Sequence, residues 1–248
     1  MTFEIRTIDN ILKGKISVIQ LKHGFRFGFD TVFLAAFVNS FLQNYKKKDA
    51  LLADVGSGVG TISLIIAHKN EKIRLTAIEN NHQYLKLAKE NIINNNFEKQ
   101  IKLLNNDVLN INKDLVNTFD IVVSNPPFYK EYKNRSKNEL ENYAKIIMNI
   151  EQWINSAVKL LKDKGMIFLI ITTEILDTVL FYLRKKTGSF KVFPFWPNSK
   201  SSSKRVILVA RKGGASPTEL MSGLKLYNKK NLMTKKARLI SEEGIFNY

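Results

Sequence analysis

The segment Asn125-Pro126-Pro127-Phe128 combines residue types that could hold an amino group for reaction. The amide oxygen of Asn125 and the carbonyl of Pro126 could accept hydrogen bonds from the amine, which favours the pyramidal nitrogen of a transition state. The two prolines fix the backbone, and the ring of Phe128 could stack on a flipped base. The pattern therefore favours methyl transfer from a sulfonium to an exocyclic amine, which needs no strong base. A purely structural Pro-Pro turn is the alternative.

A glycine-rich loop lies upstream, at residues 54–60, between an apolar run and a helical pattern. Its spacing is GxGxG, made by Gly56, Gly58 and Gly60. Small residues there allow a sharp turn and the close approach of a ligand. Thr61 occupies the last glycine position of the dinucleotide pattern, and Asp54 would oppose a pyrophosphate but suits an ammonium group. The spacing argues against NAD, and a tight turn without a ligand is the alternative.

Two acids end the next two apolar runs. Glu79 follows the loop at the distance where an acid can accept hydrogen bonds from both ribose hydroxyls. Asp107 could receive an adenine amino group, while Val108 packs on the ring. An exposed helix cap for Glu79 and a local Asx turn for Asp107 are the structural alternatives.

Short apolar runs alternate with helical patterns from Ala50 onward, which is typical of a parallel sheet with crossover helices. Strands are expected at Leu51–Val55, Arg74–Glu79, Ile101–Asn106, Phe119–Ser124, Met166–Thr172, Lys191–Phe195 and Arg205–Ala210. Helices are expected at Gly60–His68, Asn81–Asn95, Glu139–Leu161 and Glu174–Lys186, with Gly165 and Gly188 ending the last two. The last two strands lack room for a helix between them. We therefore predict an α/β fold with a seven-stranded, mostly parallel sheet and a terminal antiparallel hairpin.

The ends of the chain carry weaker patterns. Residues 1–49 should form an extension, with a strand at Lys15–Leu21 and a helix that Asp30 caps. Residues 50–213 should form the core, and residues 214–248 a tail on the same single domain. In that tail we expect a short strand at Leu224–Tyr227 and a mobile segment after it.

The composition restricts the function classes. The 248 residues carry 39 Lys and Arg against 22 Asp and Glu, a net charge of +17 that favours a polyanionic partner such as nucleic acid. A genome-wide codon bias toward lysine is the alternative. Cysteine is absent, no apolar run is long enough to span a membrane, and the start lacks a signal-peptide pattern, so we expect a cytoplasmic protein. The three histidines show no metal-ligand spacing, and we expect neither a metal nor a membrane partner; a monomer is favoured.

Together these motifs resemble the class I S-adenosylmethionine-dependent amino-methyltransferases, a fold related to the Rossmann sheet, over residues 51–212. The segment Gln20–Ala36 and the basic strand Lys204–Gly213 are similar to bacterial tRNA1(Val) adenine-N6 methyltransferases. Two features depart from that pattern: Asn80-Asn81 replaces a more apolar neighbour, and the region after Gly214 is not diagnostic.

The resemblance implies an S-adenosylmethionine cofactor, and a tRNA substrate in which the modified adenosine lies next to the anticodon. We assign cofactor binding to Asp30, Asp54, Gly56, Gly58, Gly60, Glu79, Asn80, Asp107, Val108 and Asn125. The basic loop after Phe128, with Lys130, Lys133, Arg135 and Lys137, should guide RNA toward the reacting residues; a solvated linker is the alternative. The same motifs also fit a guanine-N2 methyltransferase of ribosomal RNA, a glutamine methyltransferase of a release factor, or an RNA-binding module without activity.

Overall fold

The computed structural model describes residues 5–23, 26–47, 49–126 and 139–246, and within 139–148 it describes the backbone alone. The chain forms two compact units, one of residues 1–107 with 233–248 and the other of residues 108–232. Domain boundaries near residues 49 and 213 stay a prediction.

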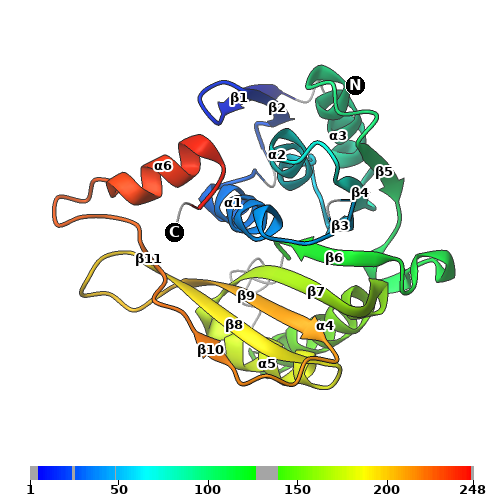
Figure 1. Ribbon diagram of the computed structural model, residues 1–248, viewed down its shortest axis with the longest axis vertical. Helices are drawn as coiled ribbons and strands as arrows, with labels where there is room; N and C mark the ends of the chain where they lie inside the picture. The colour runs from blue at the N-terminus through cyan, green and yellow to red at the C-terminus, as the bar shows by residue number, and fades with distance from the viewer. Residues whose placement is uncertain (1–4, 24–25, 48, 127–138, 247–248) are drawn as a thin grey trace. The chain divides into compact units, whose positions relative to one another are not determined.

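The first unit contains a three-stranded parallel sheet in the order β3-β4-β5, a hairpin of β1 and β2, and four helices. Helices α1 and α2 lie side by side, and α6 packs against α1 (Figure 1). Its elements are β1 (Arg6–Ile11), β2 (Ile16–Leu21), α1 (Phe29–Gln43), β3 (Leu51–Val55), α2 (Thr61–Lys69), β4 (Arg74–Glu79), α3 (His82–Asn94), β5 (Ile101–Asn105) and α6 (Lys235–Glu243).

The strands and helices of this unit follow their sequence patterns. Strand β3 is buried almost throughout, as expected for a parallel strand covered on both faces. The side chain of Asn81 caps α3 by accepting from the backbone N–H groups of Gln83 and Tyr84. Asp30 was expected to cap α1, but Gly28 occupies that position and Asp30 lies in the first turn. There its negative charge still faces the positive end of the helix dipole.

The C-terminal segment corrects one expectation. A mobile tail was predicted, whereas Lys235–Glu243 form α6, which the Thr234 side chain caps. Phe246 is 2% exposed, with its ring against Phe33 and Phe37. Ser40 on α1 exchanges hydrogen bonds with the backbone of Phe246. These contacts explain why the tail is ordered although its sequence is polar.

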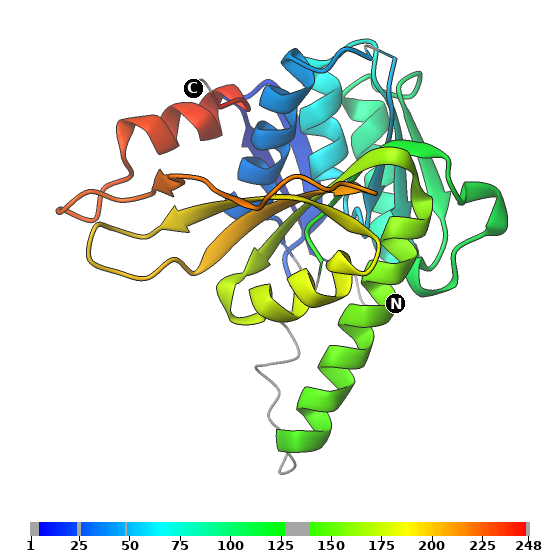
Figure 2. The same cartoon turned by 60° about the horizontal axis from the view of Figure 1, so that its bottom comes forward.

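The second unit contains the remaining strands in the order β6-β7-β9-β8-β10, with β11 also paired to β8. Figure 2 shows α4 and α5, which pack against each other. Its elements are the 3₁₀ turns at Val108–Asn110, Lys113–Leu115 and Thr173–Ile175, β6 (Phe119–Ser124), α4 (Glu139–Leu160), β7 (Leu161–Thr172), α5 (Leu176–Arg184), β8 (Thr187–Trp196), β9 (Arg205–Lys212), β10 (Glu219–Leu220) and β11 (Leu224–Lys225).

All seven predicted strands are present, and the α/β class is confirmed. The pairs β3–β4, β4–β5 and β6–β7 are parallel, whereas β9 is antiparallel to both β7 and β8. The terminal hairpin of β8 and β9 is thus confirmed. The short strand expected at Leu224–Tyr227 is present as β11, which pairs in parallel with the end of β8.

Gly165 plays a different part from the one expected. It lies inside β7, and α4 ends before it, at Leu160. A Cβ added there would lie 2.9 Å from the carbonyl oxygen of Lys162 and 3.1 Å from that of Asp120. The glycine therefore permits a close approach of backbone to backbone inside the sheet.

Candidate active site

The glycine loop connects β3 to α2 in the first unit (Figure 1). Its three glycines, Gly56, Gly58 and Gly60, have φ angles of 69°, 55° and 86°, which side chains rarely tolerate. A Cβ added at Gly56 or Gly58 would meet no atom within 4 Å, whereas at Gly60 it would meet Ala88 at 3.7 Å. The first two glycines thus face open space that a ligand can occupy, and the third allows the loop to lie against α3.

Glu79, at the carboxyl end of β4, holds this loop in place. One carboxylate oxygen accepts from Gly58 N at 2.9 Å. The other accepts from Asn80 N at 3.0 Å and Asn81 N at 2.9 Å. Because a carboxylate offers about four lone-pair sites and three are used here, Glu79 can still accept one hydrogen bond from a ligand, at Oε2. Glu79 therefore stabilises the conformation of the loop, a role that its position in the sequence did not indicate.

Asp54 is the residue before the last of β3, directly before the loop, and is 0% exposed. Its Oδ2 accepts from the backbone N–H and the hydroxyl of Ser63, at 3.1 and 2.8 Å. Its Oδ1 is buried and has no hydrogen-bond partner in the described part of the chain. Burial raises the pKa of Asp54 to about 7; the Ser63 hydrogen bonds oppose this, and the charge of Glu79 adds to it. A cation at Oδ1 would restore the charged form.

Three other buried polar atoms of the first unit lack a partner among the described residues. They are the hydroxyl oxygens of Ser57 and Thr61 and the amide oxygen Oδ1 of Asn106. Ser57 and Thr61 belong to the loop and the start of α2, and Asn106 follows β5, where its backbone N–H donates to the carbonyl of Glu79 at 3.1 Å. A buried polar group without a partner costs about 1–3 kcal/mol. Their clustering at one sheet edge indicates a polar ligand there.

The structure places the other predicted cofactor residues as follows. Asn80 is exposed beside Glu79, and Asp107 is half-buried just beyond β5. Asp30 lies in the first turn of α1, outside the hydrogen bonds that join the loop to Glu79. Val108 begins the second unit, so its place relative to the loop is not described.

A buried asparagine that the sequence did not single out also supports the loop. Asn91 on α3 is 0% exposed and donates from Nδ2 to the carbonyls of Val59, at 3.0 Å, and Ile19, at 2.9 Å. Its Oδ1 accepts from Ile19 N at 2.7 Å. It thus connects the loop to β2, and only its position on a buried helix face could have indicated this.

The expected reacting residues belong to the second unit. Asn125 and Pro126 follow β6, all of whose residues are buried, and Pro126 is itself buried. A strand buried in this way holds the backbone at Asn125 rigidly. Thr172, at the end of the neighbouring β7, has a buried hydroxyl without a partner among the described residues. Pro127 and Phe128 lie outside the described residues, as do Lys130, Lys133, Arg135 and Lys137.

The described residues show neither a metal cluster nor a membrane-spanning helix. No group of three or more His, Asp or Glu side chains could hold a metal ion there. No described helix is long and apolar enough to cross a membrane.

Comparison with known proteins adds family information. Residues 34–193 match the family model of the methyltransferase small domain. A tRNA1(Val) (adenine(37)-N6)-methyltransferase of Histophilus somni (strain 129Pt) is 26% identical over 237 residues, which cover 89% of this chain and 90% of that protein. One of the same name from a Flavobacteriaceae bacterium (strain 3519-10) is 26% identical over 204 residues, covering 78% and 80%.

Solved structures share the fold. A predicted O-methyltransferase from Agrobacterium tumefaciens superposes with a TM-score of 0.72 at 19% identity, covering 88% of this chain and 98% of that one. TYW2 of M. jannaschii, solved in complex with AdoMet, gives a TM-score of 0.54 at 15% identity, covering 86% and 87%. The methyltransferase-like sheet expected from the sequence is therefore confirmed.

Proposed function

Since this chain belongs to the methyltransferase small domain family, we propose that it transfers a methyl group from S-adenosylmethionine to N6 of an adenosine in tRNA. The similarity to tRNA1(Val) (adenine(37)-N6)-methyltransferases, over 78–89% of this chain, supports an adenosine beside the anticodon of tRNA(Val) as the target. The observation that carries the cofactor assignment is the glycine cradle, open at Gly56 and Gly58 and bordered by buried acceptors without partners. A tRNA substrate favours a cytoplasmic location.

The residues of the first unit fit this cofactor. Oδ1 of Asp54 would accept from the ammonium group, and the one lone-pair site of Glu79 that the backbone leaves unused, on Oε2, would accept from a ribose hydroxyl. Asp107 would receive the adenine amino group. The open space at Gly58 would admit the ligand close to the backbone. When bound, S-adenosylmethionine supplies an electrophilic methyl group on a sulfonium centre.

The residues of the second unit would prepare the amine. The Asn125 side-chain oxygen and the Pro126 carbonyl would each accept an N–H of the adenine amino group, so that its lone pair turns toward the methyl carbon. Phe128 would stack on the base and hold its orientation. The amino nitrogen would take up the methyl group as the bond from that methyl to sulfur breaks, and the proton released from nitrogen would pass to water. No side chain has to act as a strong base.

Incubation with labelled S-adenosylmethionine and total tRNA lacking the modification, followed by nucleoside mass spectrometry, tests the proposal. We expect N6-methyladenosine in one tRNA. Parallel incubations with ribosomal RNA and with a release factor test the two alternative amines, which methylguanosine or methylated glutamine in those reactions would support. Binding of tRNA without any transfer would support the inactive RNA-binding module.

Asp54 predicts how cofactor affinity depends on pH. Its pKa near 7 means that the carboxyl is largely protonated at lower pH and must lose that proton to bind an ammonium group. Affinity should therefore rise with pH, by up to about tenfold per unit, until roughly pH 7. It should fall again where the α-amino group deprotonates, near pH 8. Calorimetry across this range measures both limbs.

Asp54→Asn is the matched control, because it keeps the shape and can still accept from Ser63. We expect weaker binding without the rise below pH 7. Either of two results would contradict the ammonium contact assigned to Asp54. One is a wild-type affinity that stays constant from about pH 5.5 to 7, and the other is a variant whose affinity rises with pH as in the wild type.

A further inference from the structure

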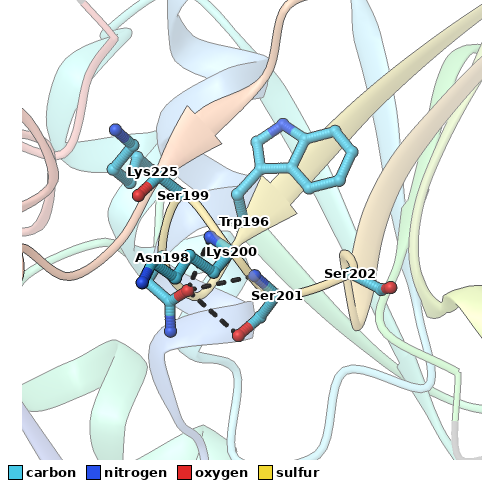
Figure 3. Close-up of a pocket in the computed structure, with 7 residues that line it drawn as sticks. All are labelled: Trp196, Asn198, Ser199, Lys200, Ser201, Ser202 and Lys225. Atoms are coloured by element: carbon cyan, nitrogen blue, oxygen red, sulfur yellow. Dashed lines mark hydrogen bonds between the residues drawn. The ribbon is translucent and has the colours of Figure 1, made fainter.

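A pocket outside the proposed active site opens in the second unit, where β8 ends and β11 runs beside it (Figure 3). Its volume is about 470 Å³, within the range of small-ligand sites. Trp196, the loop between β8 and β9, and Lys225 line it. Its seven lining residues include two lysines, three serines and one asparagine but no acid, so its charge suits an anion.

Strand pairing explains how an aromatic ring and a cation come together here. Trp196 pairs with Lys225, and the preceding Phe195 pairs with Leu224. Phe195 and Leu224 are 2% and 4% exposed, so their side chains face the core. Since side chains alternate along a strand, Trp196 and Lys225 share the outer face. The indole N–H of Trp196 donates to the carbonyl of Ser222 at 3.2 Å, which fixes the ring while it stays 37% exposed.

The loop that closes the pocket is organised by one side chain. Oδ1 of Asn198 accepts from Lys200 N at 2.9 Å, and from Ser201 N and Oγ at 3.0 Å each. Figure 3 shows these hydrogen bonds among the residues that line the pocket. The loop is therefore preformed, and its Lys200 lines the pocket together with Lys225. A preformed site loses less entropy when it binds its ligand.

We propose that this pocket binds one unpaired nucleotide of the RNA substrate, away from the reacting adenosine. Lys200 and Lys225 contact its phosphates, and its base stacks on Trp196. A stacking ring beside a pair of cations is the combination with which proteins hold single-stranded RNA. The proposal rests on the proposed function, because it takes RNA to be the substrate.

Tryptophan fluorescence of the full chain reports on the pocket directly. The protein has two tryptophans, and Trp153 is only 4% exposed. Stacking of a base on Trp196 should quench emission in a saturable way when a tRNA(Val) transcript is added. Trp196→Phe should lose this response, and Trp196→Ala should bind the transcript about fivefold or more weakly. Absence of quenching, or the same quenching by inorganic phosphate alone, would overturn the proposal.

The lysines are tested by the dependence of tRNA affinity on salt. Each phosphate contact contributes about 0.7 to the slope of log affinity against log salt, so the double variant Lys200→Gln/Lys225→Gln should lower the slope by about 1 to 2. The matched control is Lys72→Gln/Lys102→Gln, two exposed lysines of the first unit. KM for tRNA should rise in the pocket variant while kcat stays the same. Equal slopes for pocket and control variants would overturn the proposal.

The outcomes separate this inference from the proposed function. If the protein methylates tRNA but the pocket variants bind tRNA normally, the RNA-binding role of the pocket is refuted and the proposed function stands. Quenching and a changed salt slope without methylation of any tRNA would refute the proposed function alone.

Discussion

Asn125→Ala should lower the rate of methyl transfer about a hundredfold or more while leaving most of the cofactor affinity in place. The lost amide oxygen would act mainly on the target amine, and a preorganised hydrogen-bonding group of this kind is typically worth about 3 kcal/mol in the transition state. The buried strand β6 and the buried Pro126 should hold the backbone at this position. Single-turnover rates on one tRNA(Val) transcript measure the effect, and calorimetry measures cofactor affinity.

Asn112→Ala provides a control in the same unit. Asn112 caps a short 3₁₀ turn by accepting from Asp114 N, so its loss should change local stability and leave the transfer rate unchanged. A near-normal rate for Asn125→Ala would show that residues 125–128 form only a turn. The mechanism would then be wrong even if the cofactor site were right.

The buried strands could be predicted because their apolar character is local. Phe119–Ser124 is buried at every position, and such a run is recognisable without knowledge of its neighbours. Strand β1 was missed because Arg6–Ile11 alternates exposed and half-buried residues and pairs only with β2. Helix α6 was missed because Phe246 docks on α1, about 200 residues earlier in the chain, a contact that no local pattern encodes.

The candidate site likewise has features that the local sequence predicts and features that depend on the fold. The glycine spacing and the acid Glu79 were visible because each follows a strand directly. The hydrogen bond from Gly58 N to Glu79, across 21 residues, was not visible in the sequence. It makes Glu79 a residue that holds the loop in place, in addition to a candidate ligand-binding residue. Oδ1 of Asp54, which has no hydrogen-bond partner among the described residues, likewise depends on burial by several segments at once, and only the folded structure reveals it.

Gly58→Ala should weaken cofactor binding about tenfold to a hundredfold, because an added methyl group would occupy the space that the ligand needs. Forcing extra volume into a filled site typically costs about 1–3 kcal/mol. Backbone strain alone must be separated from this effect, since φ at Gly58 is 55°. A left-handed conformation costs a non-glycine residue about 1–2 kcal/mol.

Gly213→Ala is the matched control for strain. Gly213 has a φ of 66° and, like Gly58, no atom within 4 Å of an added Cβ, but it lies beyond β9 in the second unit. Both variants should therefore lose similar amounts of thermal stability, whereas only Gly58→Ala should lose cofactor affinity in calorimetry. The hydrogen bond from residue 58 to Glu79 uses the backbone N–H, so alanine can retain it. If the two variants bound S-adenosylmethionine equally well, the open space at Gly58 would not be the cofactor cradle, and the site would have to lie elsewhere.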